Sequence, residues 1–170
     1  MSSFRFDLSP ARGERYEQPH NERSQHDLAE LPNLIGARLG PTEWVEATQE
    51  QVNCFAELTG DRNFLHVDPE RARSTPFGGT IAHGFLSLSM LAPVVQLLRV
   101  DDATMSVNYG LDKVRFPAPL RVGARWRSAA QIIDVVEIDG GVQATVVASA
   151  EIEGSTRPAV VAECLIRFYA

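Results

Sequence analysis

Two polar side chains in one short segment have the types and the spacing for acid–base chemistry. Asp61 and His66 lie five residues apart in the segment TGDRNFLH, directly after Gly60, which is expected to end a helix. A loop of this length can fold back so that a carboxylate and an imidazole face one small volume and hold a water molecule. The apolar Phe64 and Leu65 between them would exclude bulk water from that volume. The spacing therefore predicts a general acid–base pair.

A glycine-containing segment further along the chain, PFGGTIAHG, predicts a hydrogen-bond donor for a carbonyl oxygen. Gly78 and Gly79 allow a backbone to approach a ligand closely, because glycine has no Cβ. Gly84 is expected to begin a helix, so its N–H is one of the unpaired donors at the positive end of the helix dipole. A thioester carbonyl placed there would have its developing negative charge stabilised, as in an oxyanion hole. For His83 we favour a structural role at the helix end over one in orienting the first loop.

The first elements that must position these groups are a short strand and two short helices. Residues 41–48 are expected to form a first strand. Thr48 and Gln51 have the spacing of a capping box and predict the start of a helix that ends at Gly60. Residues 61–67 are expected to be a loop, and Asp68 followed by proline predicts a second short helix.

The rest of the chain predicts one buried helix and four strands. Residues 83–98 are apolar or small at nearly every position, which indicates a long helix buried on all sides, although Pro93 should kink or shorten it. Short turns, of which 139–141 is the strongest, make the strands antiparallel neighbours. The expected strands are Met105–Phe116, Ala124–Ile138, Val142–Ile152 and Ala159–Tyr169. The fold class is therefore expected to be α+β, an antiparallel sheet curled around a buried helix.

Composition and charge exclude several classes of protein. The 170 residues are 44% hydrophobic and 22% charged, which is typical of a globular domain. Sixteen Lys and Arg against 22 Asp and Glu give a net charge of −6, which argues against a general affinity for nucleic acid or anionic membranes. The chain has neither an apolar run long enough for membrane insertion nor a secretory signal, so a cytoplasmic location is expected. Cys54 and Cys164 are expected to be buried free thiols, with no metal-ligand spacing.

The chain is expected to divide into two parts. Residues 1–30 carry many charges and no sustained apolar period, which predicts an N-terminal extension that is flexible or drapes over the domain. Residues 31–170 are expected to form the single domain.

The two motifs together, TGDRNFLHVDPERA followed by PFGGTIAHG, resemble the signature of the MaoC-like, (R)-specific enoyl-CoA hydratases, which have the hot-dog fold. The stretch NYGLDKVRFPAPLRVGARWR is most similar to the branch that includes nodulation protein N. The resemblance covers about residues 35–168 and implies an antiparallel β-sheet wrapped around a long central α-helix. Phe64, where many members have proline, and Ala92, where some have serine, depart from the family pattern and leave the acyl chain length open.

This resemblance also implies an activity and residue roles. The activity is reversible hydration of trans-2-enoyl-CoA to (R)-3-hydroxyacyl-CoA, a hydro-lyase reaction of fatty acid metabolism. Asp61 and His66 would hold and activate the water, with the identity of the base left open because the two titrate as a coupled unit. Asn63 would support their loop, and the Gly84 N–H would polarise the thioester carbonyl. No metal or redox cofactor is implied, since CoA is part of the substrate. A homodimer is expected, because hot-dog domains pair through their sheets and pairing closes an edge strand.

Other functions stay open on the residues alone. A hot-dog thioesterase would direct water to the carbonyl carbon, but such enzymes usually carry a carboxylate on the central helix, and residues 84–98 contain no Asp or Glu. A non-catalytic acyl-binding or assembly module would not need Asp61 or His66. The carrier of the acyl group is either CoA or acyl carrier protein. Five basic residues fit either contacts with CoA phosphates or a solvated strand face: Lys113, Arg115, Arg121, Arg125 and Arg127.

Overall fold

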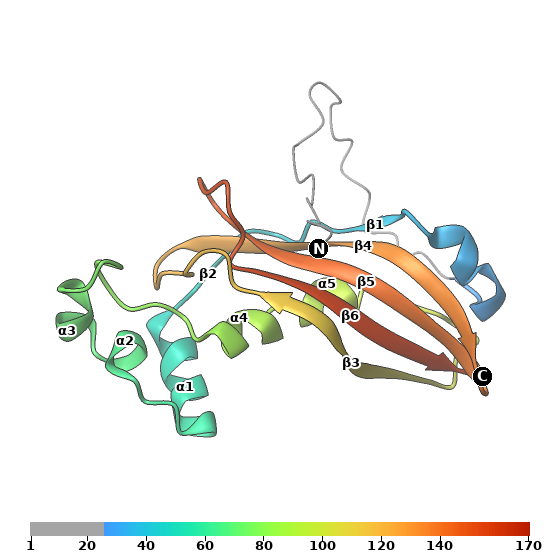
Figure 1. The fold of residues 1–170 in the computed structure, drawn as a ribbon, viewed down its shortest axis with the longest axis horizontal. Coiled ribbons are helices and arrows are strands. Elements are labelled where there is room, and N and C mark those ends of the chain that lie inside the picture. Colours follow the sequence, from blue (N-terminus) through green and yellow to red (C-terminus); the bar gives the residue numbers. More distant parts are fainter. Residues whose placement is uncertain (1–25) are drawn as a thin grey trace, which may run out of the picture.

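The computed structural model describes residues 26–170, and these form one antiparallel sheet with helices on one of its faces and at both ends (Figure 1). The sheet has six strands in the order β1-β4-β5-β6-β3, with β2 also paired to β4. Segregated helices and an antiparallel sheet confirm the expected α+β class. The expectation of an N-terminal extension falls mostly on residues 1–25, outside the described residues.

The four long strands agree with the predicted strands to within one residue at each end. They are β3 (Met105–Arg115), β4 (Arg125–Ile138), β5 (Gly141–Ile152) and β6 (Val160–Tyr169). In β4, β5 and β6 alternate residues bury one face of this sheet, here called the inner face, whereas β3 has no buried residue. Several of the buried residues are alanines that face one another across neighbouring strands, which lets a helix pack closely: Ala130, Ala148 and Ala162 lie in register.

The expected first strand over residues 41–48 is mostly wrong. Only β2 (Val45–Glu46) pairs within that range, and β1 (Arg38–Leu39), which the sequence did not indicate, pairs with β4 further along. Gly40 has a φ of 80°, and Pro41 has no N–H to donate to a ladder. The two residues therefore divide one edge of the sheet into two short pieces.

Three helices form a cluster beyond one end of the sheet (Figure 1). The capping box at Thr48 is present and begins α1 (Gln49–Thr59), which ends at Gly60 in the left-handed conformation, as predicted. The expected loop over residues 61–67 instead contains one helical turn, α2 (Phe64–Val67). The predicted cap at Asp68 is confirmed, because its side chain accepts a hydrogen bond from the N–H of Arg71 at the start of α3 (Pro69–Arg73).

The long central helix expected over residues 83–98 divides into α4 (Gly84–Ser89) and α5 (Ala92–Val95). Pro93 has no N–H for the carbonyl of Ser89, so the continuous helix breaks just before it. The helix pair is also not buried on all sides. Val94 is buried against the sheet, whereas Phe85 is 72% exposed, because one curved sheet covers only one side of a helix.

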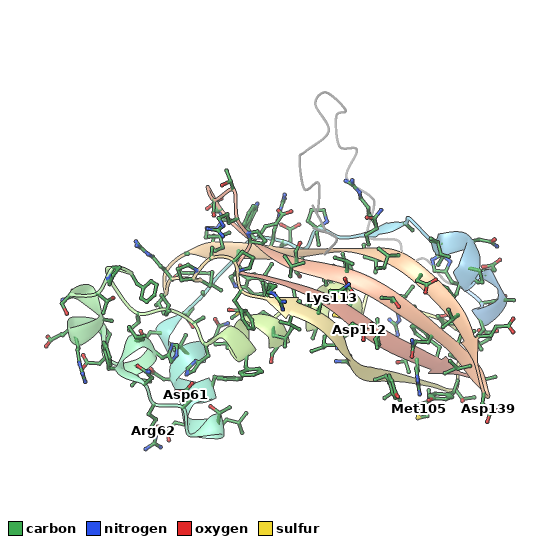
Figure 2. The ribbon with its side chains drawn as sticks, viewed as in Figure 1. Asp61, Arg62, Met105, Asp112, Lys113 and Asp139 are labelled. Atoms are coloured by element: carbon green, nitrogen blue, oxygen red, sulfur yellow. The ribbon has the colours of Figure 1, made fainter. Side chains whose placement is uncertain are left out.

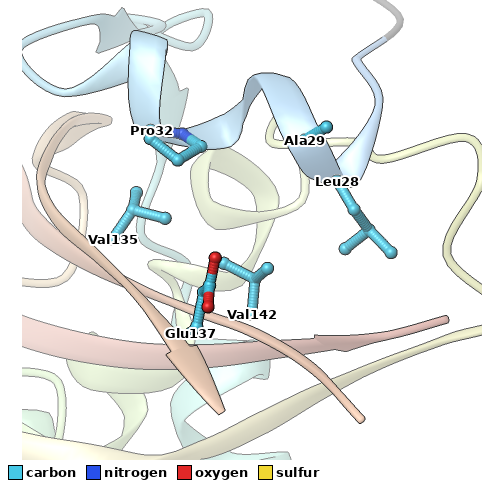
Figure 3. Close-up of a pocket in the computed structure, with 6 residues that line it drawn as sticks. All are labelled: Leu28, Ala29, Pro32, Val135, Glu137 and Val142. Atoms are coloured by element: carbon cyan, nitrogen blue, oxygen red, sulfur yellow. The ribbon is translucent and has the colours of Figure 1, made fainter.

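An extra residue in β4 reverses the direction of the side chains that follow it. Pairing with β5 passes from Ile132 opposite Val146 to Asp134 opposite Thr145, so Ile133 is the bulged residue. Val135 and Glu137 therefore face the inner side. There β4 and β5 meet the 3-10 helix η1 (Leu28–Leu34), which covers the sheet end opposite α1–α3 (Figure 1). The cavity between them measures about 430 Å³ and is lined by Leu28, Ala29, Pro32, Val135, Glu137 and Val142 (Figure 3).

The two cysteines differ from each other. Cys164 on β6 is buried as expected, and burial raises the pKa of its thiol to about 11. Cys54 is exposed, which corrects the expectation of a second buried thiol. Its position on α1 lies off the buried stripe formed by Val52 and Ala56. Among the described residues, no helix is both long enough and apolar enough to cross a bilayer.

A glycine at the start of β5 gives a test of the sheet. A Cβ on Gly141 would lie 2.0 Å from the carbonyl oxygen of Phe168, a backbone atom that cannot turn aside. We expect Gly141→Ala to lower the free energy of unfolding by on the order of 2 kcal/mol or more, measured by urea denaturation. Gly110→Ala in β3 is the control, because no atom lies within 4 Å of the added Cβ. Equal losses in the two variants would contradict the pairing of β5 with β6 near Gly141.

Candidate active site

His66 is held by one ring nitrogen, and the other has no hydrogen-bond partner within residues 26–170. Its Nδ1 lies 2.8 Å from the carbonyl oxygen of Ile81. A carbonyl oxygen only accepts hydrogen bonds, so Nδ1 carries the proton and donates it, and Nε2 of the neutral ring has the lone pair. The side chain is half-buried at the edge of the helix cluster. His66 is therefore oriented as a proton acceptor.

The backbone around His66 is fixed by contacts from three segments. The N–H of Ile81 donates to the carbonyl of Leu65 at 3.0 Å, so residues 65 and 66 both bond to Ile81. The side chain of Gln49 donates to the carbonyl of His66 at 2.7 Å and accepts from the hydroxyl of Thr80 at 2.6 Å. The sequence analysis missed Gln49 and Thr80 as supports of this site, because a bond between side chains 31 residues apart leaves no local pattern.

Asp61 occupies the turn that follows α1. Its carboxylate oxygen Oδ1 accepts from the N–H of Asn63 at 3.3 Å, and its side chain is exposed. The side chain of Asn63 in turn caps α2 by accepting from the N–H of Leu65 at 3.1 Å. Figure 2 shows Asp61 beside Arg62 in the helix cluster, where the Arg62 guanidinium pairs with Glu57 and not with Asp61.

His83 contacts both halves of the candidate site. It is 2% exposed, and its ring stacks on that of His66 with centroids 3.8 Å apart. Its Nε2 donates to the carbonyl oxygen of Asp61 at 2.9 Å, so the lone pair is on Nδ1, which is buried and has no partner among the described residues. His83 also precedes Gly84 directly. It thereby connects the Asp61 loop, the His66 ring and the first residue of α4.

Gly84 presents an unpaired N–H at the start of α4. Within residues 26–170 this group has no hydrogen-bond acceptor. The ring of Phe116 packs against the glycine, since a Cβ at position 84 would lie 3.2 Å from a ring carbon. The sequence predicted a long helix with a large dipole at this point, but α4 has only six residues. The N–H group of Gly84 itself is therefore the main hydrogen-bond donor, and the helix dipole contributes less than expected.

The structure brings Asp61, His66 and His83 together, with one potential ligand atom of each within 4.8 Å of the others. A metal ion needs imidazole lone pairs that converge on one point in the ring planes. The stacked rings, inclined by 29°, place their planes nearly parallel instead, which disfavours a shared ion. A water molecule needs only two hydrogen bonds of about 2.8 Å, which together span about 4.5 Å between Asp61 and His66. The geometry therefore suits a held water.

Three of the five basic residues noted in the sequence have carboxylate partners. Each pair ties neighbouring segments of the sheet, as a solvated strand face would. The pairs are Lys113 with Glu163 at 2.9 Å, Arg125 with Glu153 at 3.0 Å and Arg127 with Glu151 at 2.8 Å.

Comparison with known proteins identifies the family. Residues 30–153 match the family described as MaoC like domain. The chain belongs to the MaoC-like domain family. Among its relatives, 3-hydroxyacyl-thioester dehydratase Z from Mycobacterium tuberculosis is 47% identical over 150 residues, covering 87% of this chain and 99% of that protein. Nodulation protein N from Rhizobium leguminosarum bv. viciae is 41% identical over 149 residues, covering 79% of this chain and 86% of that protein.

Solved structures confirm the fold of this MaoC-like protein. The (R)-hydratase from A. caviae involved in PHA biosynthesis superposes with a TM-score of 0.65 and 25% identity, covering 78% of this chain and 94% of that chain. The hot-dog fold and the family that the motifs indicated are therefore both confirmed, with the central helix corrected to two short ones. The dehydratase and hydratase names of the relatives support a hydro-lyase activity.

The contacts of His83 predict that replacing this residue loosens the loop from Asp61 to His66 while the free energy of unfolding changes little. His83→Phe removes the donor to Asp61, which costs about 1 kcal/mol, but it also removes a buried unpaired nitrogen, whose cost is of similar size. We expect the free energy of unfolding to change by no more than about 1 kcal/mol, while hydrogen exchange at residues 61–66 becomes faster. Phe55→Leu, which alters another ring neighbour of His83, is the control and should leave that exchange unchanged. Unchanged exchange in His83→Phe would contradict the role of this contact.

Proposed function

We propose that this MaoC-like protein hydrates trans-2-enoyl thioesters reversibly to (R)-3-hydroxyacyl thioesters. The observation that carries the proposal is the Asp61–His66 pair, in which one ligand atom of each side chain lies within 4.8 Å of the other, close enough for one water molecule to bond to both. Gly84, with its unpaired N–H, follows the residue that contacts both members of the pair. The names of the relatives describe the same chemistry, since dehydration of a 3-hydroxyacyl thioester is the reverse reaction.

The proposed hydration begins with the water held between Asp61 and His66. Nε2 of His66 accepts a proton from the water, because Nδ1 is already committed to Ile81. The carboxylate of Asp61 accepts a hydrogen bond from the second O–H, whose hydrogen stays on the oxygen and becomes that of the 3-hydroxyl. The water oxygen forms a bond to C3, and the electron pair of the C2–C3 double bond moves towards the thioester carbonyl. A proton then returns from the pair to C2, so that one water is added and both side chains regain their starting forms.

The Gly84 N–H supplies the electrophilic contact in this proposal. The negative charge on the thioester oxygen is largest in the enolate-like transition state, so a fixed N–H donor stabilises that state more than the substrate. No electron leaves the substrate and no group other than water is transferred. The proposed chemistry therefore needs no redox cofactor, the Gly84 N–H polarises the carbonyl in place of a metal ion, and CoA enters as part of the substrate.

The loss of enoyl absorbance on mixing the protein with crotonyl-CoA and a longer enoyl-CoA tests this function. We expect hydration by the wild type, a fall of about 10²-fold or more in Asp61→Asn and in His66→Gln, and the (R) isomer on chiral analysis. Asp68→Asn is the matched control, because Asp68 lies in the same segment but only caps α3. A folded wild type that hydrates neither substrate would refute the proposal, and thioester cleavage would then point to a thioesterase.

We propose in addition that two copies pair through β3. Among the described strands β3 pairs only with β6, so its other edge is open. Four apolar side chains on this strand are 37–55% exposed: Met105, Val107, Tyr109 and Leu111. Figure 2 shows that the strand extends from Met105, at the far end of the sheet, past Asp112 and Lys113 towards the helix cluster. An open, apolar edge of eleven residues is a surface that proteins cover.

Sedimentation equilibrium tests the pairing. We expect twice the chain mass of 18.7 kDa for the wild type and the mass of one chain for Val107→Asp, because a carboxylate would be buried in the joined edge. Val136→Asp on β4 is the control, since Val136 is 41% exposed and Val107 is 37% exposed. A wild-type monomer, or dissociation by both variants alike, would contradict pairing at β3.

A further inference from the structure

We propose that Arg121 and the backbone of the Gly78-Gly79 turn form a subsite for a phosphate of the carrier that bears the acyl thioester. This inference rests on the proposed function, because it concerns how the carrier of the same substrate is held. The chemistry is shared by CoA and by acyl carrier protein, since both attach the thioester through a phosphate-bearing pantetheine arm.

Arg121 lies one backbone pairing away from the segment that holds His66. It forms an isolated antiparallel bridge with Ile81, flanked by the bonds from Ala82 N–H to the Leu120 carbonyl at 2.7 Å and from Val122 N–H to the Thr80 carbonyl at 3.0 Å. The other edge of Ile81 bonds to residues 65 and 66. Three backbone segments, 65–66, 80–82 and 120–122, therefore lie side by side and fix Arg121 beside the candidate active site.

The side chain of Arg121 lies on the surface next to the glycine turn. Leu120 is 1% exposed, whereas Arg121 is exposed, as expected from alternation along an extended segment. Two guanidinium nitrogens lie 3.9 Å from the position that a Cβ on Gly78 would take. The N–H of Gly79 has no acceptor among the described residues, and no atom lies within 4 Å of a Cβ built on it. The guanidinium thus lies beside a glycine turn whose Gly79 N–H has no partner among the described residues, and proteins use both kinds of group to bind phosphate.

The state of the other four basic residues noted in this part of the sequence distinguishes Arg121 from them. Lys113, Arg125 and Arg127 each pair with a glutamate, so their charges are already balanced. Arg115 donates to the carbonyl of the preceding residue. The guanidinium of Arg121 has no hydrogen bond or ion pair within residues 26–170, although the chain as a whole carries an excess of carboxylates. A guanidinium without a partner in the described part of the chain, beside a site proposed for a thioester, is suited to an anionic group on that substrate.

The expected result follows from comparing crotonyl thioesters that differ only in their phosphates. The substrates are crotonyl-pantetheine, which has none, crotonyl-4′-phosphopantetheine, crotonyl-CoA and crotonyl-acyl carrier protein. In Arg121→Ala we expect KM for crotonyl-CoA to rise about 10-fold with kcat unchanged, and KM for crotonyl-pantetheine to stay at the wild-type value. Arg121→Lys should recover part of the loss, because a point charge replaces a two-pronged donor. Arg125→Ala, which removes an arginine paired with Glu153, is the matched control and should change neither KM.

The pattern over the four substrates assigns the phosphate. An effect shared by the phosphopantetheine, CoA and carrier-protein thioesters places the phosphate of the pantetheine arm on Arg121. An effect confined to crotonyl-CoA also supports the subsite and assigns it to the nucleotide phosphates of CoA. A rise in KM that is equal for crotonyl-pantetheine, or no rise for any substrate, would overturn the proposal.

Calorimetric titration with CoA separates this proposal from the proposed function, because it needs no turnover. If the wild type binds CoA and Arg121→Ala weakens the Kd about 10-fold, the subsite stands even where hydration is not observed. If hydration is observed and the Kd for CoA is the same in both proteins, the subsite is wrong while the hydratase proposal is retained.

Discussion

The hydrogen bond from Nδ1 of His66 to the carbonyl oxygen of Ile81 determines what the site can do, because it fixes which ring nitrogen carries the proton. The N–H of Ile81 donates to the carbonyl of Leu65, and the carbonyl of Ile81 accepts from the ring of His66. Both polar backbone groups of Ile81 therefore bond to α2 and hold the helical turn that carries His66. Gln49 holds the same turn from α1. The remaining nitrogen, Nε2, is thereby left as the acceptor of a ring that lies close to the carboxylate of Asp61.

Short helices and the loops between them position the candidate active-site residues, and the sheet supports these helices. His83 connects these elements, since it donates to the carbonyl of Asp61, stacks on the ring of His66 and directly precedes Gly84, the first residue of α4. The inner face of the sheet packs against α5, where Val94 is buried, but covers only one side of the helix pair. This explains why Phe85 and the apolar side chains of β3 are exposed near a sheet whose core is otherwise closed. A second copy at β3 would cover part of this surface.

Much of the fold followed from local patterns. Alternation and glycine turns predicted the four long strands to within one residue, and capping residues predicted both ends of α1 and the start of α3. The break before Pro93 was foreseen, but the exposure of Phe85 was not, because apolar composition does not show how many sides a partner covers. Spacing and the two motifs predicted the proximity of Asp61 and His66. The bond between Gln49 and Thr80 and the exposure of Cys54 depend on tertiary geometry, which leaves no signal in sequence.

The tautomer of His66 decides whether its ring can accept a proton from water. Nitrogen-15 NMR of the imidazole rings, assigned with the His66→Gln variant, identifies which nitrogen is protonated in the neutral form of each histidine. We expect a proton on Nδ1 and a bare Nε2 for His66, with the opposite arrangement for His83. A neutral His66 with its proton on Nε2 would contradict the proposed role of this residue, because that nitrogen could not accept a proton from water held beside Asp61.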